Sequence, residues 1–205
     1  MSTRILDIGL WLLVGWPLAY VLWAFYQVQF AGDLFYLGAD PIEAIIHFLG
    51  EWSVWLLWLV ILMPVLQRKT RLPFNRYRRR VGVSVFLYAL LHGLSYFGLM
   101  QGFDLTSLIE DLNDRPYVVV GFLALVALTP LVITSTKGWQ RRLKKKWKSL
   151  HKLVYPIAVL SLLHVWWQVK ASFGYAVLIT LLLVIILIVK FLPAYLARVK
   201  TSSNL

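Results

Sequence analysis

Residues 117–135 read YVVVGFLALVALTPLVITS, a run of 19 positions without a charged side chain. A helix rises about 1.5 Å per residue, so a run of this length spans a hydrocarbon core of about 30 Å. Five more apolar stretches follow the same pattern, at about 9–29, 43–66, 81–101, 151–169 and 174–192. The sequence therefore predicts an all-α integral membrane protein, built as a six-transmembrane helix bundle.

The composition agrees with a chain whose main solvent is lipid. Of its 205 residues 60% are hydrophobic and 15% are charged, and the mean hydropathy is +0.72. These values exceed what a soluble domain of this length exposes to water. The first apolar run is too long for a signal-peptide core and lacks a small-residue cleavage site, so we expect a retained helix. The connections are short, and we expect one transmembrane domain over residues 1–205.

The charged residues predict one orientation. The 21 Lys and Arg residues gather in blocks, and residues 67–80 and 136–150 each hold seven of them with no acid. The connections on the other side hold Asp and Glu, with Arg115 as their single base. By the positive-inside rule the basic blocks and both termini are cytoplasmic. The net charge of +12 is thus explained by topology and attraction to membrane lipid, and we expect no nucleic acid partner.

The four histidines, His47, His92, His151 and His164, all fall inside or at the edge of a predicted span. Polar side chains in lipid are costly and usually mark a cofactor, an ion path or an interhelical hydrogen bond. Imidazole is the common axial ligand of haem iron. Since the chain has no cysteine, c-type haem attachment and thiolate metal sites are excluded. The pattern therefore predicts b-type haem held by histidines.

Helical rise sorts these histidines by depth. Counted from the basic blocks, His92 lies roughly 18 Å and His164 roughly 24 Å above the cytoplasmic surface. We expect these two to share one haem, with His47 as a further candidate in the same outer half. His151 lies within about 5 Å of the cytoplasmic edge and suits a second, inner haem. Pro156, between His151 and His164, is expected to kink their helix and adjust its phase.

Simpler readings stand beside each assignment. His92 and His164 are also compatible with a metal-free interhelical hydrogen bond, and His151 with an interfacial position beside a basic loop. His47 is four residues before Glu51 and could pair with it on one helical face. At the level of function, the rivals are a small proton-coupled transporter or channel that uses intramembrane His and Glu, and a structural anchor for another subunit.

Several short motifs, taken together, resemble one family. In chain order they are LGADP at 37–41, HF at 47–48, RRRVG at 78–82, LH at 91–92, RPY at 115–117, TST at 134–136, and WKSLHKLVY at 147–155 followed by His164. The combination covers nearly the whole chain and is similar to the MsrQ (YedZ) family, the haem-binding membrane subunits of bacterial protein-methionine-sulfoxide reductase systems. The resemblance implies a ferric-reductase-like transmembrane domain in the bacterial inner membrane.

The resemblance also implies a function, cofactors and partners. Such subunits pass electrons from the quinone pool or a cytosolic flavin reductase, through one or two haem b groups, to a periplasmic molybdopterin subunit of the MsrP type. That partner reduces methionine sulfoxide in oxidised periplasmic proteins, so the substrate chemistry is expected there. Family descriptions also include FMN. The family's haem histidines map onto His92, His151 and His164, and the histidine of its second span maps onto His47.

This chain departs from the wider oxidase pattern at its inner end. Those relatives carry two histidines on each of two helices, whereas Arg78 and Arg79 stand where a second histidine of the third span would lie. A guanidinium group suits carboxylates and phosphates. We therefore regard the block as a candidate contact for haem propionates, quinone or a flavin-bearing donor, with lipid attraction alone as the alternative. The candidate residues are Arg76, Arg78, Arg79 and Arg80.

Overall fold

The computed structural model describes residues 3–169 and 173–202, and those ranges contain helices and no strand. Six helical segments are long and apolar enough to cross a membrane. The all-α, six-span prediction is thereby confirmed. The elements are α1 (Thr3–Tyr26), η1 (Gln27–Ala31), α2 (Pro41–Thr70), α3 (Phe74–Ser95), η2 (Tyr96–Met100), α4 (Leu105–Asp114), α5 (Pro116–Ile133), α6 (Lys137–Leu143), α7 (Lys145–Leu150), η3 (His151–Leu153), α8 (Val154–Gln168) and α9 (Gly174–Ser202).

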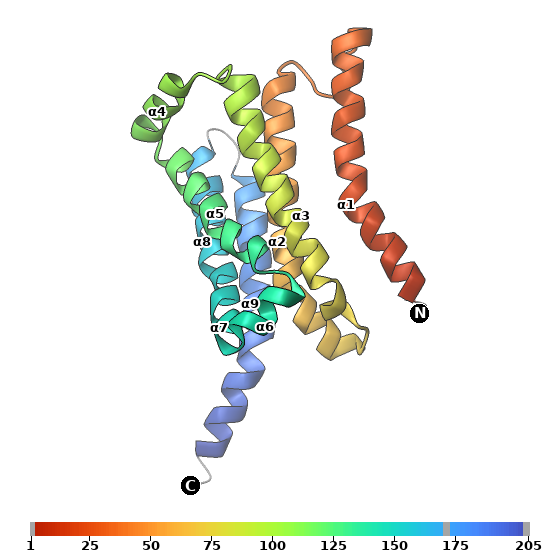
Figure 1. Cartoon of the computed structure of the whole chain (residues 1–205), viewed down its shortest axis with the longest axis vertical. Helices are drawn as coiled ribbons and strands as arrows, with labels where there is room; N and C mark the ends of the chain where they lie inside the picture. The colour runs from red at the N-terminus through yellow and green to blue at the C-terminus, as the bar shows by residue number, and fades with distance from the viewer. Residues whose placement is uncertain (1–2, 170–172, 203–205) are drawn as a thin grey trace.

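The spans run up and down, so the connections divide between two ends of the bundle (Figure 1). The α1–α2 connection and α4 lie at one end, which we call the outer end, and the α2–α3 turn, α6 and α7 lie at the other. The outer end carries the acidic connections, and the opposite end carries both basic blocks. The start of α1 and the end of α9 share the basic end, while residues 1–2 and 203–205 lie outside the described part.

Helix α2 forms the centre of the bundle because it packs against α3 along its length and also contacts α8 and α9. Its side chains Leu56 and Ile61 are fully buried, as is Val85 on α3. The indole N–H of Trp58 donates to the carbonyl of Ile179 on α9 at 2.9 Å. By contrast, large apolar side chains on α1, α5 and α9 face outward, as they must where the surrounding solvent is lipid.

Helix α1 stands at one side of the bundle (Figure 1) and is tied to α3 by two polar contacts. The Tyr88 hydroxyl donates to the Val14 carbonyl at 2.6 Å, deep in the span. Nearer the basic end, Arg80 pairs with Asp7 at 2.7 Å. One of the four candidate arginines is therefore already paired with α1.

The third span begins earlier than the sequence predicts. We expect it to start at about residue 81, but α3 starts at Phe74, directly after Pro73. The basic run is thus helical and continues the membrane span. Arginine is a good helix former, and no Gly or Pro interrupts residues 74–81.

The fifth span is divided where the sequence predicts one helix. Residues His151–Leu153 form a 3-10 turn between α7 and α8. Pro156 lies in the first turn of α8, where its missing N–H removes no helical hydrogen bond. The regular α-helix is thus interrupted at His151–Leu153, and the expected kink at Pro156 stays a prediction.

Helix α4 is an amphipathic segment that the pattern of apolar runs does not predict. It is capped by Asp104, which accepts hydrogen bonds from the Ser107 hydroxyl at 2.7 Å and from the Thr106 N–H at 3.0 Å. The Ser107 hydroxyl and the Thr106 and Ser107 N–H groups lower the pKa of Asp104. This is the usual cap of a helix that starts in a polar loop. Helix α4 lies at the outer end of the bundle, at its edge and beside α5 (Figure 1).

Candidate functional site

A cavity of about 700 Å³ lies among α2, α3, α5 and α8 in the outer part of the bundle, and Tyr175 of α9 contributes to its wall. This volume is typical of ligand pockets, which range over roughly 300–1,000 Å³. Its lining is mainly apolar and includes His47, His92 and His164. The buried Tyr175 hydroxyl has no hydrogen-bond partner among the described residues. The cavity therefore combines an apolar wall with a few polar groups available to a ligand.

His92 on α3 and His164 on α8 lie next to each other in this cavity. Their ring centroids are 5.9 Å apart, and the ring planes are nearly perpendicular, at 87°. His92 Nδ1 donates to the Ile46 carbonyl at 2.8 Å, and His164 Nδ1 donates to the Tyr117 carbonyl at 2.7 Å. No described residue hydrogen-bonds Nε2 of either ring. Each histidine thus keeps one ring nitrogen free for a ligand.

This spacing fits one metal ion between the two rings. With a metal–imidazole bond of about 2 Å and a ring radius of about 1 Å, two opposed axial imidazoles have centroids roughly 6 Å apart. The described residues contain no group of three or more His, Asp or Glu side chains that could hold a bare ion. Two imidazoles alone suit a metal whose remaining ligands belong to a macrocycle. The residues present therefore fit haem.

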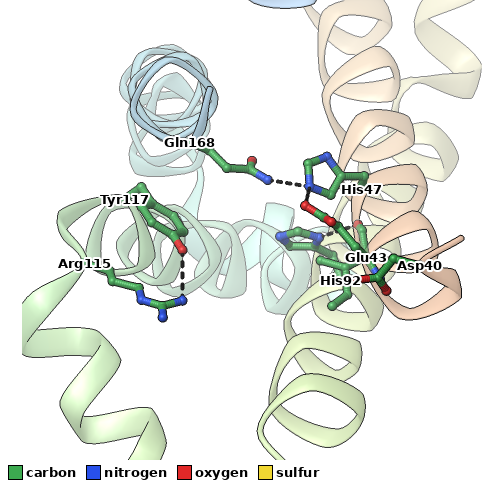
Figure 2. Close-up of polar contacts among 8 residues, drawn as sticks. Asp40, Glu43, His47, His92, Arg115, Tyr117 and Gln168 are labelled. Atoms are coloured by element: carbon green, nitrogen blue, oxygen red, sulfur yellow. Dashed lines mark hydrogen bonds and ion pairs between the residues drawn. The ribbon is translucent and has the colours of Figure 1, made fainter. Parts of the chain in front are cut away.

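His47 also lines the cavity, but its contacts differ from those of the other two. Its side chain is 43% exposed. The Gln168 amide donates to His47 Nε2 at 2.9 Å, and the Glu43 carboxylate lies 3.5 Å from the same nitrogen (Figure 2). The carboxylate in contact with His47 is therefore Glu43, one turn before it, while Glu51, the alternative raised from the sequence, interacts with His47 electrostatically. Glu51 lines the cavity one turn deeper.

His151 is not part of this group. It lies on the 3-10 turn towards the basic end and outside the cavity lining. Its Nδ1 donates to the Trp147 carbonyl at 3.1 Å, and its ring stacks on the Trp147 indole with centroids 4.0 Å apart. The Arg78 side chain interacts with it electrostatically. The structure thus separates His151 from the other three histidines, as the depth argument expects.

The four candidate arginines at the start of α3 do not line this cavity, whereas Arg115 does. Arg115 Nη1 donates to the Tyr117 hydroxyl at 3.4 Å (Figure 2), and this hydrogen bond raises the pKa of Arg115. Its Nε lies 3.0 Å from Asp111 Oδ1. Arg115 is a functional candidate that sequence reasoning misses. The available signal was its position as the single base in the acidic connections.

Helix α4 covers part of the outer end of the cavity. Leu108 and Leu112 belong to the cavity lining. Asp111 of α4 is buried and accepts hydrogen bonds from the Tyr96 hydroxyl and the Gln101 amide. These two donors lie at the end of the third span, so the contact joins α4 to the helix that carries His92.

Comparisons with known proteins agree with this architecture. A family model described as the ferric reductase like transmembrane component matches residues 49–162. A curated protein-methionine-sulfoxide reductase heme-binding subunit MsrQ from Xanthomonas axonopodis pv. citri (strain 306) is 43% identical over 158 residues, which are 76% of this chain and 72% of the relative. The protein of the same name from Rhodospirillum rubrum is 42% identical over 175 residues, covering 82% of this chain and 81% of the relative.

Proposed function

This chain belongs to the MsrQ family of heme-binding subunits, within the ferric reductase like transmembrane components, and from that premise we propose that it is a haem b electron-transfer subunit. The observation that carries the proposal is the pair of imidazoles 5.9 Å apart in an apolar cavity. His92 and His164 would hold the iron of an outer haem. When bound, haem iron supplies reversible one-electron redox chemistry.

The protein's own residues hold and insulate this site. The carbonyls of Ile46 and Tyr117 hold the two imidazoles in one tautomer by accepting from Nδ1. Apolar side chains form most of the cavity wall. Arg115, at its outer mouth, is placed to neutralise an anionic group such as a propionate. His47 lies beside this site and is not one of its two ligands, because its Nε2 already contacts Gln168 and Glu43.

His151 is the proposed ligand of a second haem near the inner end. A second haem is supported by the spacing of 13 residues between His151 and His164, which corresponds to about 20 Å of helical rise. Arg78 interacts with His151 and is the best placed of the four arginines for a propionate or a donor. Arg80 is a weaker candidate, since it is engaged by Asp7, and Arg76 and Arg79 remain candidates from the sequence pattern alone.

The proposed setting is the bacterial inner membrane, with both termini in the cytoplasm and the chain acting as a single domain. The quinone pool or a cytosolic flavin reductase supplies electrons, and a periplasmic MsrP-like molybdopterin subunit receives them. The basic inner end and the acidic outer end support this orientation. FMN is a candidate second cofactor that the family resemblance alone suggests, and a flavin assay on the purified chain tests it.

The proposed partner chemistry has a direct test. The purified chain is reduced, freed of reductant, and mixed anaerobically with the catalytic subunit of a methionine sulfoxide reductase and methionine sulfoxide. We expect the reduced b-type absorbance to decay, with two electrons and two protons consumed for each sulfoxide converted to thioether and water. A mixture without sulfoxide serves as the control and should stay reduced.

A stable reduced spectrum in the complete mixture, with the catalytic subunit shown to be active with a chemical donor, contradicts the proposed partner. A proton-coupled transporter, the rival function, predicts no b-type bands at any stage. Glu43, His47 and Gln168 form the polar cluster on which that rival would depend. The absorbance of the starting material therefore separates the two functions before the reaction is begun.

A further inference from the structure

Two glycines, Gly50 and Gly121, lie close to the rings of His92 and His164, respectively, and in the same way. Gly50 on α2 lies four residues after Ile46, whose carbonyl accepts from His92. Gly121 on α5 lies four residues after Tyr117, whose carbonyl accepts from His164. Each histidine ring therefore lies over one helical turn of a neighbouring helix, with a glycine at the far end of that turn. The arrangement occurs twice, on unrelated stretches of sequence.

The space at each glycine is too small for a side chain. A Cβ atom at Gly50 would lie 2.9 Å from His92 Nδ1 and 3.1 Å from Cε1. At Gly121 it would lie 2.7 Å from His164 Nδ1 and 2.8 Å from Cε1. Ordinary van der Waals contact begins at 3.4 Å, so each ring would have to move by several tenths of an ångström. Gly121 is the tighter of the two.

Among the other glycines whose surroundings the structure describes, similar crowding occurs at Gly98, where a Cβ would lie 2.7 Å from Phe103 Cζ and no histidine is involved. A Cβ at Gly82, on the same helix as His92, would meet nothing within 4 Å, and the same holds for Gly15 on α1. Alanine is a better helix former than glycine at an interior position. The close approach of the rings therefore accounts for glycine at 50 and 121, whereas helix propensity would favour another residue.

The ring nitrogen nearest each glycine is Nδ1, and the proton on this nitrogen fixes the tautomer of the histidine. A ring that donates Nδ1–H to a backbone carbonyl keeps Nε2 as the unprotonated nitrogen, and a ligating imidazole is usually held by such an outer contact. A ring pushed away from the turn would lose this hydrogen bond and rotate. Each glycine thus influences the direction of Nε2 through the position of the ring, without contacting the metal or its other ligands.

We propose that Gly50 and Gly121 are positioning residues, which admit the rings of His92 and His164 to the backbone carbonyls of Ile46 and Tyr117 and so aim both Nε2 atoms at one haem iron. The inference rests on the proposed function, because it takes the two histidines as axial ligands. It assigns a role to two residues that carry no polar side chain.

The test compares Gly50→Ala and Gly121→Ala with Gly82→Ala and Gly15→Ala, all purified as the full chain with haem supplied during expression. The readouts are haem per polypeptide, the low-field EPR signal of the oxidised protein and its midpoint potential. Changes in the outer contacts of metal ligands weaken binding by roughly 10- to 100-fold. We expect a loss in that range for Gly121→Ala, a smaller loss for Gly50→Ala, and a shifted EPR signal in both.

The two control variants should keep the wild-type signal and haem content. A role in helix packing alone would lower stability in the Gly50 and Gly121 variants without moving the EPR signal or the potential of the haem they retain. If all four variants match the wild type in every readout, the inference is overturned while the haem assignment stands. A wild-type chain that binds no haem overturns the proposed function, and the inference with it.

A second measurement needs no variant and applies if Gly121→Ala fails to fold. Pulsed EPR of the oxidised wild-type chain reports the quadrupole coupling of the remote imidazole nitrogens, which falls when Nδ1–H is hydrogen-bonded. We expect a lowered coupling for both axial histidines. A coupling equal to that of imidazoles without an acceptor would overturn the inference.

Discussion

Replacing His92 or His164 by alanine is expected to abolish the outer haem. Each substitution removes one of the two axial bonds, so haem binding should fall by more than the roughly 10- to 100-fold typical of an outer-contact change. The measurement is haem per polypeptide, with the reduced-minus-oxidised spectrum of the purified variant. His92 and His164 should give the same result, since the two rings share one cavity.

Two further histidine variants are the matched controls. His47→Ala should leave most of the outer haem, because His47 Nε2 is already engaged by Gln168 and Glu43. His151→Ala should also leave the outer haem in place, because His151 lies outside the cavity lining. Any loss of haem in this variant would belong to an inner haem. Full haem content in both the His92 and His164 variants would refute the ligand assignment.

Removing the Asp111 carboxylate is expected to weaken the attachment of α4 to the outer end of the cavity. In Asp111→Ala, the Tyr96 hydroxyl and the Gln101 amide lose their acceptor, and Arg115 loses its ion pair. A buried donor left without a partner costs about 1–3 kcal/mol. Opening of α4 should therefore become about 10- to 100-fold more frequent, which hydrogen exchange of the α4 amides measures.

Asp114→Ala is the control for this prediction. Asp114 is on the same helix and is exposed, so its removal should leave the exchange rates of α4 close to those of the wild type. Equal hydrogen-exchange rates of the α4 amides in the two variants would show that Asp111 does not hold α4 in place. Faster exchange confined to Asp111→Ala would support the role of this carboxylate.

The six spans and their alternation could be predicted from the sequence because lipid imposes a simple rule on length and polarity. The basic blocks at 67–80 and 136–150 lie at one end of the bundle, as the alternation of the spans predicts, and the cytoplasmic placement of that end stays a prediction. Helical rise also grouped His47, His92 and His164 and set His151 apart. These features depend on position along one helix, which a sequence records directly.

Other features depend on contacts between helices, and the sequence does not show these. The approach of His164 to Gly121 requires the relative register of α5 and α8, and neither residue signals the other. Residues 151–153 look like the start of a membrane helix, because no Gly or Pro among them marks the 3-10 turn. Arg115 stood out as a lone base, yet its place at the cavity required the fold of α4.

The haem content of the wild-type chain, purified after expression with haem supplied, tests the central claim most directly. We predict at least one haem per polypeptide with sharp b-type bands in the reduced-minus-oxidised spectrum, and the EPR signal of a low-spin iron with two imidazole ligands when oxidised. A folded chain that remains colourless after incubation with hemin would contradict this claim.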